Sequence, residues 1–158
     1  MNHPSLFDVN VLIAMSWPDH PFHRITSAWI QVNRSRGWAT CPITEAGFVR
    51  VSSQTAADRA RSLGDAFALL QKSCSAPDHV FWPNANSVTQ LLPEIRARLI
   101  GHKQVTDAIL LDLAIRNGGR FVTLDQRVRQ LLPAGSEHQS AIVVIPESAV
   151  IPEGTDSK

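Results

Sequence analysis

The chain of 158 residues fits one domain with a sizeable core, and its 44% hydrophobic and 18% charged content excludes a disordered protein. Its net charge of +1 neither demands nor excludes a nucleic-acid ligand, because a basic groove can lie on a nearly neutral protein. No apolar stretch approaches the ~20 residues of a membrane span and the N-terminus does not resemble a signal peptide, so we expect a cytoplasmic protein that has no membrane partner.

Short strands alternate with helices along the chain. The predicted elements are, in chain order, a strand at 5–7, helices at 11–15 and 21–37, a strand at 38–41, helices at 45–52 and 58–70, a strand at 79–82, helices at 87–92 and 107–116, a strand at 120–123, a helix at 126–132 and a strand at 141–145. Gly37 ends the second helix, and Thr44, Asp58 and Thr106 can each cap the helix that follows it.

This alternation predicts a three-layer α/β/α sandwich, in which helices cover both faces of a mostly parallel sheet. The helix at 107–116 is nearly all apolar, which indicates that it is buried. We assign residues 1–147 to this domain and residues 148–158 to a polar C-terminal tail. In open α/β sheets, functional sites form outside the carboxyl ends of the strands.

Four acidic residues stand where a strand ends or a helix begins. Asp8 and Asp125 directly follow predicted strands, whereas Glu45 and Asp107 begin predicted helices. All four are flanked by apolar residues that should be buried. Carboxylates gathered from distant parts of a chain repel one another, and a fold tolerates such a group mainly when a divalent cation occupies it. The pattern therefore predicts a divalent-metal site.

Each acid also has an ordinary explanation when it is considered alone. Asp107 could complement a helix N-terminus, Asp8 and Asp125 could be turn residues, and Glu45 could be an acid of the first helical turn. Taken together, these explanations account poorly for the fact that all four acids have apolar neighbours in the sequence. Asp112, on the same buried helix as Asp107, is predicted to be ion-paired or exposed.

Motifs for other catalytic chemistries are absent from the sequence. It contains no GxSxG, no HExxH, no P-loop and no GxGxxG. Cys41 and Cys74 form no CxxC pair, and we expect two buried thiols that belong neither to a zinc site nor to a catalytic Cys/His set. A receiver-like phosphoacceptor would need adjacent acids after the first strand and a lysine after a late strand, and neither is present.

Four segments of the chain resemble the signature blocks of the PIN domain, and more narrowly those of the VapC-type toxins of bacterial toxin–antitoxin pairs. These segments are SLFDVNVLIA, ITEAGFVRV, QVTDAILLDLA and FVTLDQRV. The resemblance extends from the N-terminus to about residue 145. It implies an α/β/α sandwich and an endoribonuclease that depends on Mg²⁺ or Mn²⁺.

Carried over block by block, the resemblance assigns catalytic and metal-binding roles to the four acids. Asp8 and Asp107 match the most direct metal ligands of the family. Asp125 would bind the metal directly or through water, and Glu45 would hold a metal-bound water. The resemblance also implies an RNA substrate, a small cognate antitoxin protein and a homodimer.

Polar and basic residues complete the predicted site. Asn10 and Thr123 fall where the family places residues that orient the acids. The basic residues that could hold RNA phosphates near the metal are Arg50, His102, Lys103 and Arg127. Each of these could instead be a solvated charge or an ion pair with one of the four acids.

The leading hypothesis is a metal-dependent endoribonuclease that hydrolyses RNA and inhibits translation or growth as a toxin. The alternative is a non-catalytic module of the same fold that binds RNA or protein. The sequence leaves open the RNA target, the number of metal ions and the identity of the antitoxin.

Overall fold

In the computed structural model, which describes residues 3–54 and 61–146, a single sheet of five parallel strands separates two layers of helices. The strands are β1 (Ser5–Phe7), β2 (Trp38–Thr40), β3 (His79–Phe81), β4 (Arg120–Thr123) and β5 (Ile142–Val144). They lie in the order β3-β2-β1-β4-β5, and each neighbouring pair is parallel. The predicted three-layer α/β/α sandwich is confirmed.

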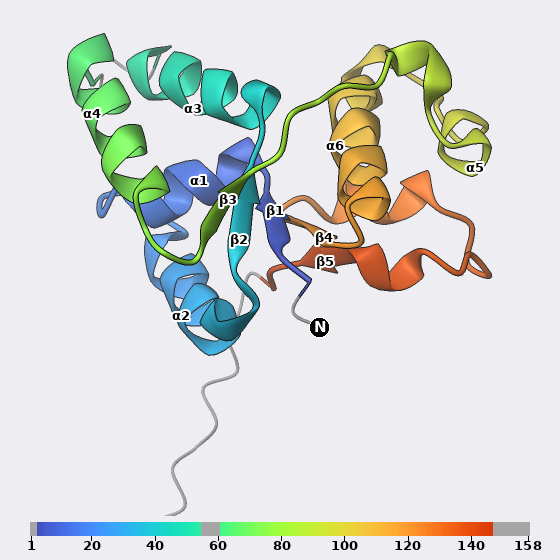
Figure 1. The fold of residues 1–158 in the computed structure, drawn as a ribbon, viewed down its shortest axis with the longest axis horizontal. Coiled ribbons are helices and arrows are strands. Elements are labelled where there is room, and N and C mark those ends of the chain that lie inside the picture. The colour runs from blue at the N-terminus through green and yellow to red at the C-terminus, as the bar shows by residue number, and fades with distance from the viewer. Residues whose placement is uncertain (1–2, 55–60, 147–158) are drawn as a thin grey trace, which may run out of the picture.

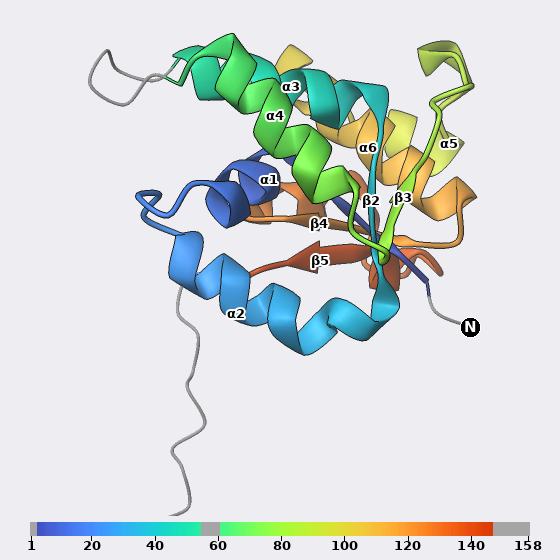
Figure 2. The same cartoon turned by 60° about the vertical axis from the view of Figure 1, so that its left-hand side comes forward.

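Helices cover both faces of the sheet. The helices are α1 (Val9–Ser16), α2 (His23–Asn33), α3 (Pro42–Gln54), α4 (Leu63–Cys74), α5 (Pro93–Arg96) and α6 (Val105–Arg116). Figure 1 shows α1 to α4 on one side of the sheet and α5 and α6 on the other, and Figure 2 shows α3 and α4 side by side. Across the two described ranges, no helix combines the length and apolar character needed to cross a bilayer.

The sheet is buried on both faces because successive strand residues point to opposite sides. In β1, Leu6 belongs to the core beneath α6, whereas Phe7 belongs to the core beneath α1 and α3. Phe121 and Val122 of β4 divide between the same two cores. β1 lies between β2 and β4, so the carboxyl ends of these three strands meet at one edge of the sheet.

Several predicted helix boundaries were wrong. α3 begins at Pro42 rather than at Glu45, because proline suits the first turn of a helix. Thr44 therefore lies within the first turn, where its Oγ1 accepts a hydrogen bond from the Cys41 backbone N–H at 2.9 Å. α6 begins at Val105, so the predicted capping residue Thr106 is already helical.

The remaining differences concern short or undescribed segments. The predicted cap Asp58 and the tail 148–158 lie outside the described residues, and α4 is capped by Ser62, whose Oγ accepts a hydrogen bond from the Asp65 backbone N–H at 3.0 Å. The predicted helices at 87–92 and 126–132 are 3₁₀ helices at Val88–Gln90 and Gln126–Leu131. α5 was not predicted, because a single turn shows no helical period.

Gly47 allows α3 to pack closely against α1. A Cβ atom at this position would overlap the side chain of Val9. We expect Gly47→Ala to lower the free energy of unfolding by about 1–3 kcal/mol, because Val9 is stiff and the two helices must separate. Urea unfolding followed by circular dichroism measures the change.

Gly64→Ala in α4 is the matched control, because a Cβ there would meet only Ser62 Oγ, at 3.9 Å. This control should leave stability unchanged or raise it by up to about 1 kcal/mol, the helix propensity difference. Equal stability of the Gly47→Ala variant and the wild type would contradict the close approach of α1 and α3.

Candidate active site

Asp8 is fixed at the point where β1 passes into α1. Its backbone N–H donates to the Val122 carbonyl at 2.9 Å, which extends the pairing of β1 with β4 by one residue. The side chain caps α1, with Oδ1 accepting from the Val9 N–H at 2.7 Å. Oδ2 accepts from the Thr123 hydroxyl at 2.7 Å. With only 8% of its surface exposed, Asp8 is a buried carboxylate held at both oxygens.

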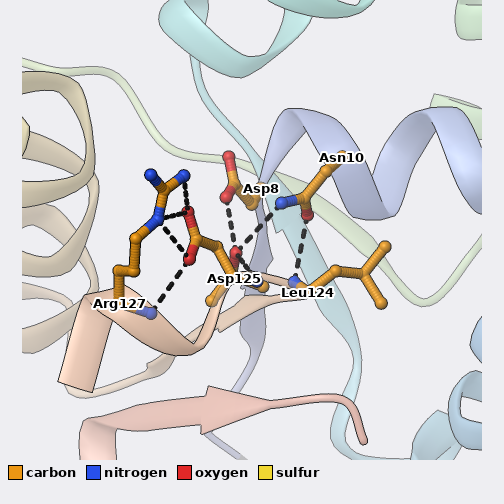
Figure 3. A network of polar contacts seen from close by, with 6 residues as sticks. Asp8, Asn10, Leu124, Asp125 and Arg127 are labelled. Atoms are coloured by element: carbon orange, nitrogen blue, oxygen red, sulfur yellow. Dashed lines mark hydrogen bonds and ion pairs between the residues drawn. The ribbon is translucent and has the colours of Figure 1, made fainter. Parts of the chain in front are cut away.

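The Thr123 hydroxyl joins three parts of the site, at Asp8, Asn10 and Asp125, which are labelled in Figure 3. While donating to Asp8, its Oγ1 accepts hydrogen bonds from Asn10 Nδ2 at 3.2 Å and from the Asp125 backbone N–H at 3.1 Å. Asn10 Oδ1 in turn accepts from the Leu124 N–H at 3.2 Å. Asn10 and Thr123 therefore lie where they can orient Asp8 and Asp125, as predicted for residues that support metal ligands.

Asp125 is paired with Arg127 (Figure 3). The carboxylate accepts from the Arg127 backbone N–H at 2.9 Å, from Nε at 3.0 Å and from Nη2 at 2.8 Å. These hydrogen bonds hold the pKa of Asp125 below its ordinary value. Of the three explanations open for Arg127, namely RNA contact, a solvated charge or an ion pair with an acid of the site, the described structure contains the ion pair.

Asp107, in the first turn of α6, completes a group of three aspartates that interact electrostatically. Burial, together with repulsion from Asp8 and then from Asp125, raises the pKa of Asp107 to about 7. Burial also raises the pKa of Asp8, with a smaller contribution from Asp125. A divalent cation with hard oxygen ligands would relieve both the burial penalty and the repulsion, so this group, which we call the aspartate group, fits such an ion.

Glu45 lies in a different set of contacts. Its Oε1 accepts a hydrogen bond from the Thr40 hydroxyl at 2.6 Å, and Cys74 Sγ lies 3.8 Å from the same oxygen. Thr40 Oγ1 also lies 2.8 Å from His79 Nε2. No contact described within residues 3–54 and 61–146 joins Glu45 to an aspartate, so the structure gathers three of the four predicted acids and holds the fourth in separate contacts after β2, the strand next to β1.

Thr40, Cys74 and His79 are the residues that sequence reasoning missed. No histidine was expected near either cysteine, but the structure brings Cys74 and His79 together at Glu45. The expectation of two buried thiols holds for Cys41 only, since Cys74 is half-buried. Cys74 and His79 are five residues apart on either side of the turn into β3, and this spacing was the one available signal.

The predicted basic residues divide between two grooves. His102, Lys103 and Arg127 line a groove of about 380 Å³ together with Asp107 and Asp125. These three side chains are exposed along the groove that contains Asp107 and Asp125, where phosphates would approach.

Arg50 is exposed on α3 and lines the other groove, of about 800 Å³, with Glu45 and Cys74. Its Nη1 donates to Gln54 Oε1 at 3.4 Å.

Asp112 is buried and ion-paired, one of the two predicted alternatives: Arg116 Nε lies 2.7 Å from its Oδ2, and the Leu92 N–H donates to its Oδ1 at 2.8 Å. Asp112 therefore holds the segment before α5 onto α6.

Comparison with known proteins places this chain in a family. The sequence matches the PIN domain over residues 5–131. Over 135 residues it is 42% identical to Ribonuclease VapC44 of Mycobacterium tuberculosis, a match that covers 85% of this chain and 95% of that protein. The chain belongs to the PIN domain family and, within it, to the VapC ribonucleases.

Other VapC proteins agree with this assignment, and a solved structure shares the fold. The chain is 40% identical to Ribonuclease VapC39 of the same organism, over 83% of this chain and 95% of that protein. It is 36% identical to Ribonuclease VapC29, also of that organism, over 89% of this chain and 96% of that protein. The crystal structure of PAE2754 from Pyrobaculum aerophilum has the same fold, with a TM-score of 0.58 at 19% identity, covering 91% of this chain and 85% of that one.

Proposed function

We propose that this VapC-family protein is a metal-dependent endoribonuclease that hydrolyses RNA phosphodiester bonds as the toxin of a toxin–antitoxin pair. The observation that carries the proposal is the convergence of Asp8, Asp107 and Asp125 at the carboxyl edge of the sheet, with a pKa of about 7 for Asp107. Repulsion among these carboxylates does not stabilise the metal-free fold. A bound divalent cation would neutralise it.

Mg²⁺ or Mn²⁺ suits this group, because both prefer carboxylate oxygens and water as ligands. Asp8 and Asp107 would hold the ion most directly. Asp125 would bind the ion directly if the ion displaced Arg127 from its carboxylate. It would bind through a water molecule if the ion pair with Arg127 remained. A bound ion of this kind activates a water molecule and stabilises negative charge on the phosphodiester. Glu45, which follows the strand adjacent to β1, would orient the attacking water.

RNA would lie over the groove beside Asp107. His102 and Lys103 would neutralise phosphates there, and Arg127 would exchange its carboxylate partner for a phosphate oxygen. Arg50 would extend this basic rim along the Glu45 side. Contacts of this type bind any RNA backbone, so the choice of target depends on loop shape and base contacts.

The cognate antitoxin would cover an apolar surface near Glu45. Leu63 and Phe67 of α4 are 57% and 59% exposed, and they line the groove that also contains Glu45 and Arg50. An antitoxin segment that places apolar side chains in this groove would block the catalytic edge.

We also propose a homodimer. A non-catalytic binding module is not favoured, because all four acids of the family pattern are present in a chain related to ribonucleases.

The test is incubation of the purified protein with total RNA in Mn²⁺ or Mg²⁺, followed by sequencing of the new RNA ends. Cleavage at defined positions that stops when EDTA is added is the expected result. Binding of RNA without cleavage in either metal, and with equal affinity in EDTA, would instead favour the non-catalytic module.

A further inference from the structure

Three side chains of different chemistry converge outside the aspartate group. Among the described residues, Glu45, Cys74 and His79 form a set in which a carboxylate oxygen, a thiol sulfur and an imidazole nitrogen all lie within 4.8 Å of one another. They come from the first turn of α3, the last residue of α4 and the first residue of β3. The fold thus assembles this set from three separate elements.

Hydrogen bonds hold the donor atoms in place. The Thr40 hydroxyl donates to Glu45 Oε1 at 2.6 Å and lies 2.8 Å from His79 Nε2, so one buried side chain positions both. The His79 ring also forms a hydrogen bond with the backbone of Cys74. A backbone partner of this kind commonly fixes the orientation of a metal-binding histidine.

The donor set has the chemistry of a zinc ligand set. Zn²⁺ binds thiolate, imidazole and carboxylate in a tetrahedral arrangement, often with three protein ligands and one water. Mg²⁺ and Mn²⁺ prefer oxygen donors, so they would favour the aspartate group. The charges of the Glu45 carboxylate and a Cys74 thiolate would balance the two positive charges of zinc.

The set is also accessible to an ion. Glu45, Cys74 and His79 are each half-buried, which excludes bulk water without sealing the donors. Glu45 and Cys74 line the open groove of about 800 Å³ between α3 and α4, which provides an entry path. The 3.8 Å between Cys74 Sγ and Glu45 Oε1 is close to the spacing of two ligands around one tetrahedral ion.

We propose that Glu45, Cys74 and His79 form a zinc site distinct from the aspartate group. On binding, the Cys74 thiol releases its proton to solvent, and His79 Nε2 exchanges its contact with Thr40 for the metal. One consequence rests on the proposed function: zinc would keep Glu45 from orienting water at the aspartate group, so zinc would inhibit RNA cleavage.

Cobalt titration of the metal-free protein tests the site without any activity measurement, because Co²⁺ takes the place of zinc and its bond to a thiolate absorbs in the near ultraviolet. We expect this thiolate-to-cobalt band in the wild type, its loss when Zn²⁺ is added, its loss in Cys74→Ser and its weakening in His79→Ala. Cys41→Ser is the matched control, because Cys41 is a buried thiol outside the set and the band should remain.

Two outcomes would overturn the site: absence of the band in the wild type, or its persistence in Cys74→Ser. Circular dichroism of each variant shows whether it has folded, and the wild-type titration decides the matter even if a variant has not.

The inhibition is tested by RNA cleavage in Mn²⁺ with and without Zn²⁺. The ratio of the two rates should fall in the wild type and in Cys41→Ser, and should stay near one in Cys74→Ser. An equal fall in all three would place the inhibition at the aspartate group and overturn the regulatory role of this site. If no RNA is cleaved, the proposed function fails while the cobalt band still decides the zinc site.

Discussion

Asp8→Asn should reduce the rate of RNA cleavage by about 10³-fold, while leaving the fold intact. Asp8 is the buried carboxylate of the aspartate group, and both of its oxygens accept hydrogen bonds. Asparagine has nearly the same shape but carries no charge, so the site would lose a ligand for the divalent ion and about 4 kcal/mol of transition-state stabilisation. The measurement is the initial rate of cleavage of a defined RNA at saturating Mn²⁺.

Stability in EDTA separates loss of chemistry from loss of structure. Asp8→Asn removes a buried charge that repels its neighbours but also removes one of two acceptor oxygens, so its melting temperature should stay within about 5 °C of the wild type. Asp65→Asn, at an exposed carboxylate on α4, is the control and should cleave RNA at the wild-type rate. A well-folded Asp8→Asn variant with wild-type activity would show that the aspartate group does not bind the catalytic metal.

Mn²⁺ should bind about tenfold more tightly at pH 8 than at pH 6, because a pKa of about 7 keeps Asp107 largely protonated at the lower pH. The ion must displace that proton, so its apparent affinity follows the ionised fraction. Electron paramagnetic resonance of free Mn²⁺ measures the affinity directly. Asp107→Asn should bind Mn²⁺ weakly and lose most of this pH dependence.

The same pKa has a consequence for the metal-free protein. Folding raises the pKa of Asp107 from the ordinary value of 3.8 to about 7. The folded state therefore favours the protonated carboxyl, so the contribution of Asp107 to stability is greatest at low pH and is lost as the pH rises toward 7. In EDTA, Asp107→Asn should therefore gain stability relative to the wild type between pH 5 and pH 8. Solvent screens a partly exposed charge and reduces the size of this gain. A Mn²⁺ affinity that is equal at pH 6 and pH 8 would contradict a protonated Asp107.

Much of the aspartate group could be predicted from the sequence, because its geometry follows from the backbone. Asp8 and Asp125 each follow a buried strand, and parallel neighbours bring such positions together. The same rule explains why Thr123 meets Asp8, since β1 and β4 pair with Phe7 opposite Val122. Asp107 was singled out because it begins a nearly all-apolar helix, and the resemblance of its segment to a family block then assigned it a metal-binding role.

The contacts of the side chains could not be predicted in this way. The Arg127 side chain can either pair with the Asp125 carboxylate or extend into solvent, and the sequence around it does not determine which. The meeting of Glu45 with Cys74 and His79 depends on β3 lying beside β2, a strand order that alternation of strands and helices leaves open. The roles proposed for the four acids and the basic residues remain predictions until the variants are measured.

The hydrogen bond between Thr123 and Asp8 spans 115 residues of sequence. A growing chain that has emerged only as far as β3 contains Asp8 and Glu45, but lacks Asp107, Asp125 and the strand that positions them. The aspartate group therefore cannot form until most of the domain has been synthesised and β4 has inserted beside β1. For a protein that cleaves RNA, this order of assembly delays activity until Asp107, β4 and Asp125 have all been synthesised and β4 has joined the sheet.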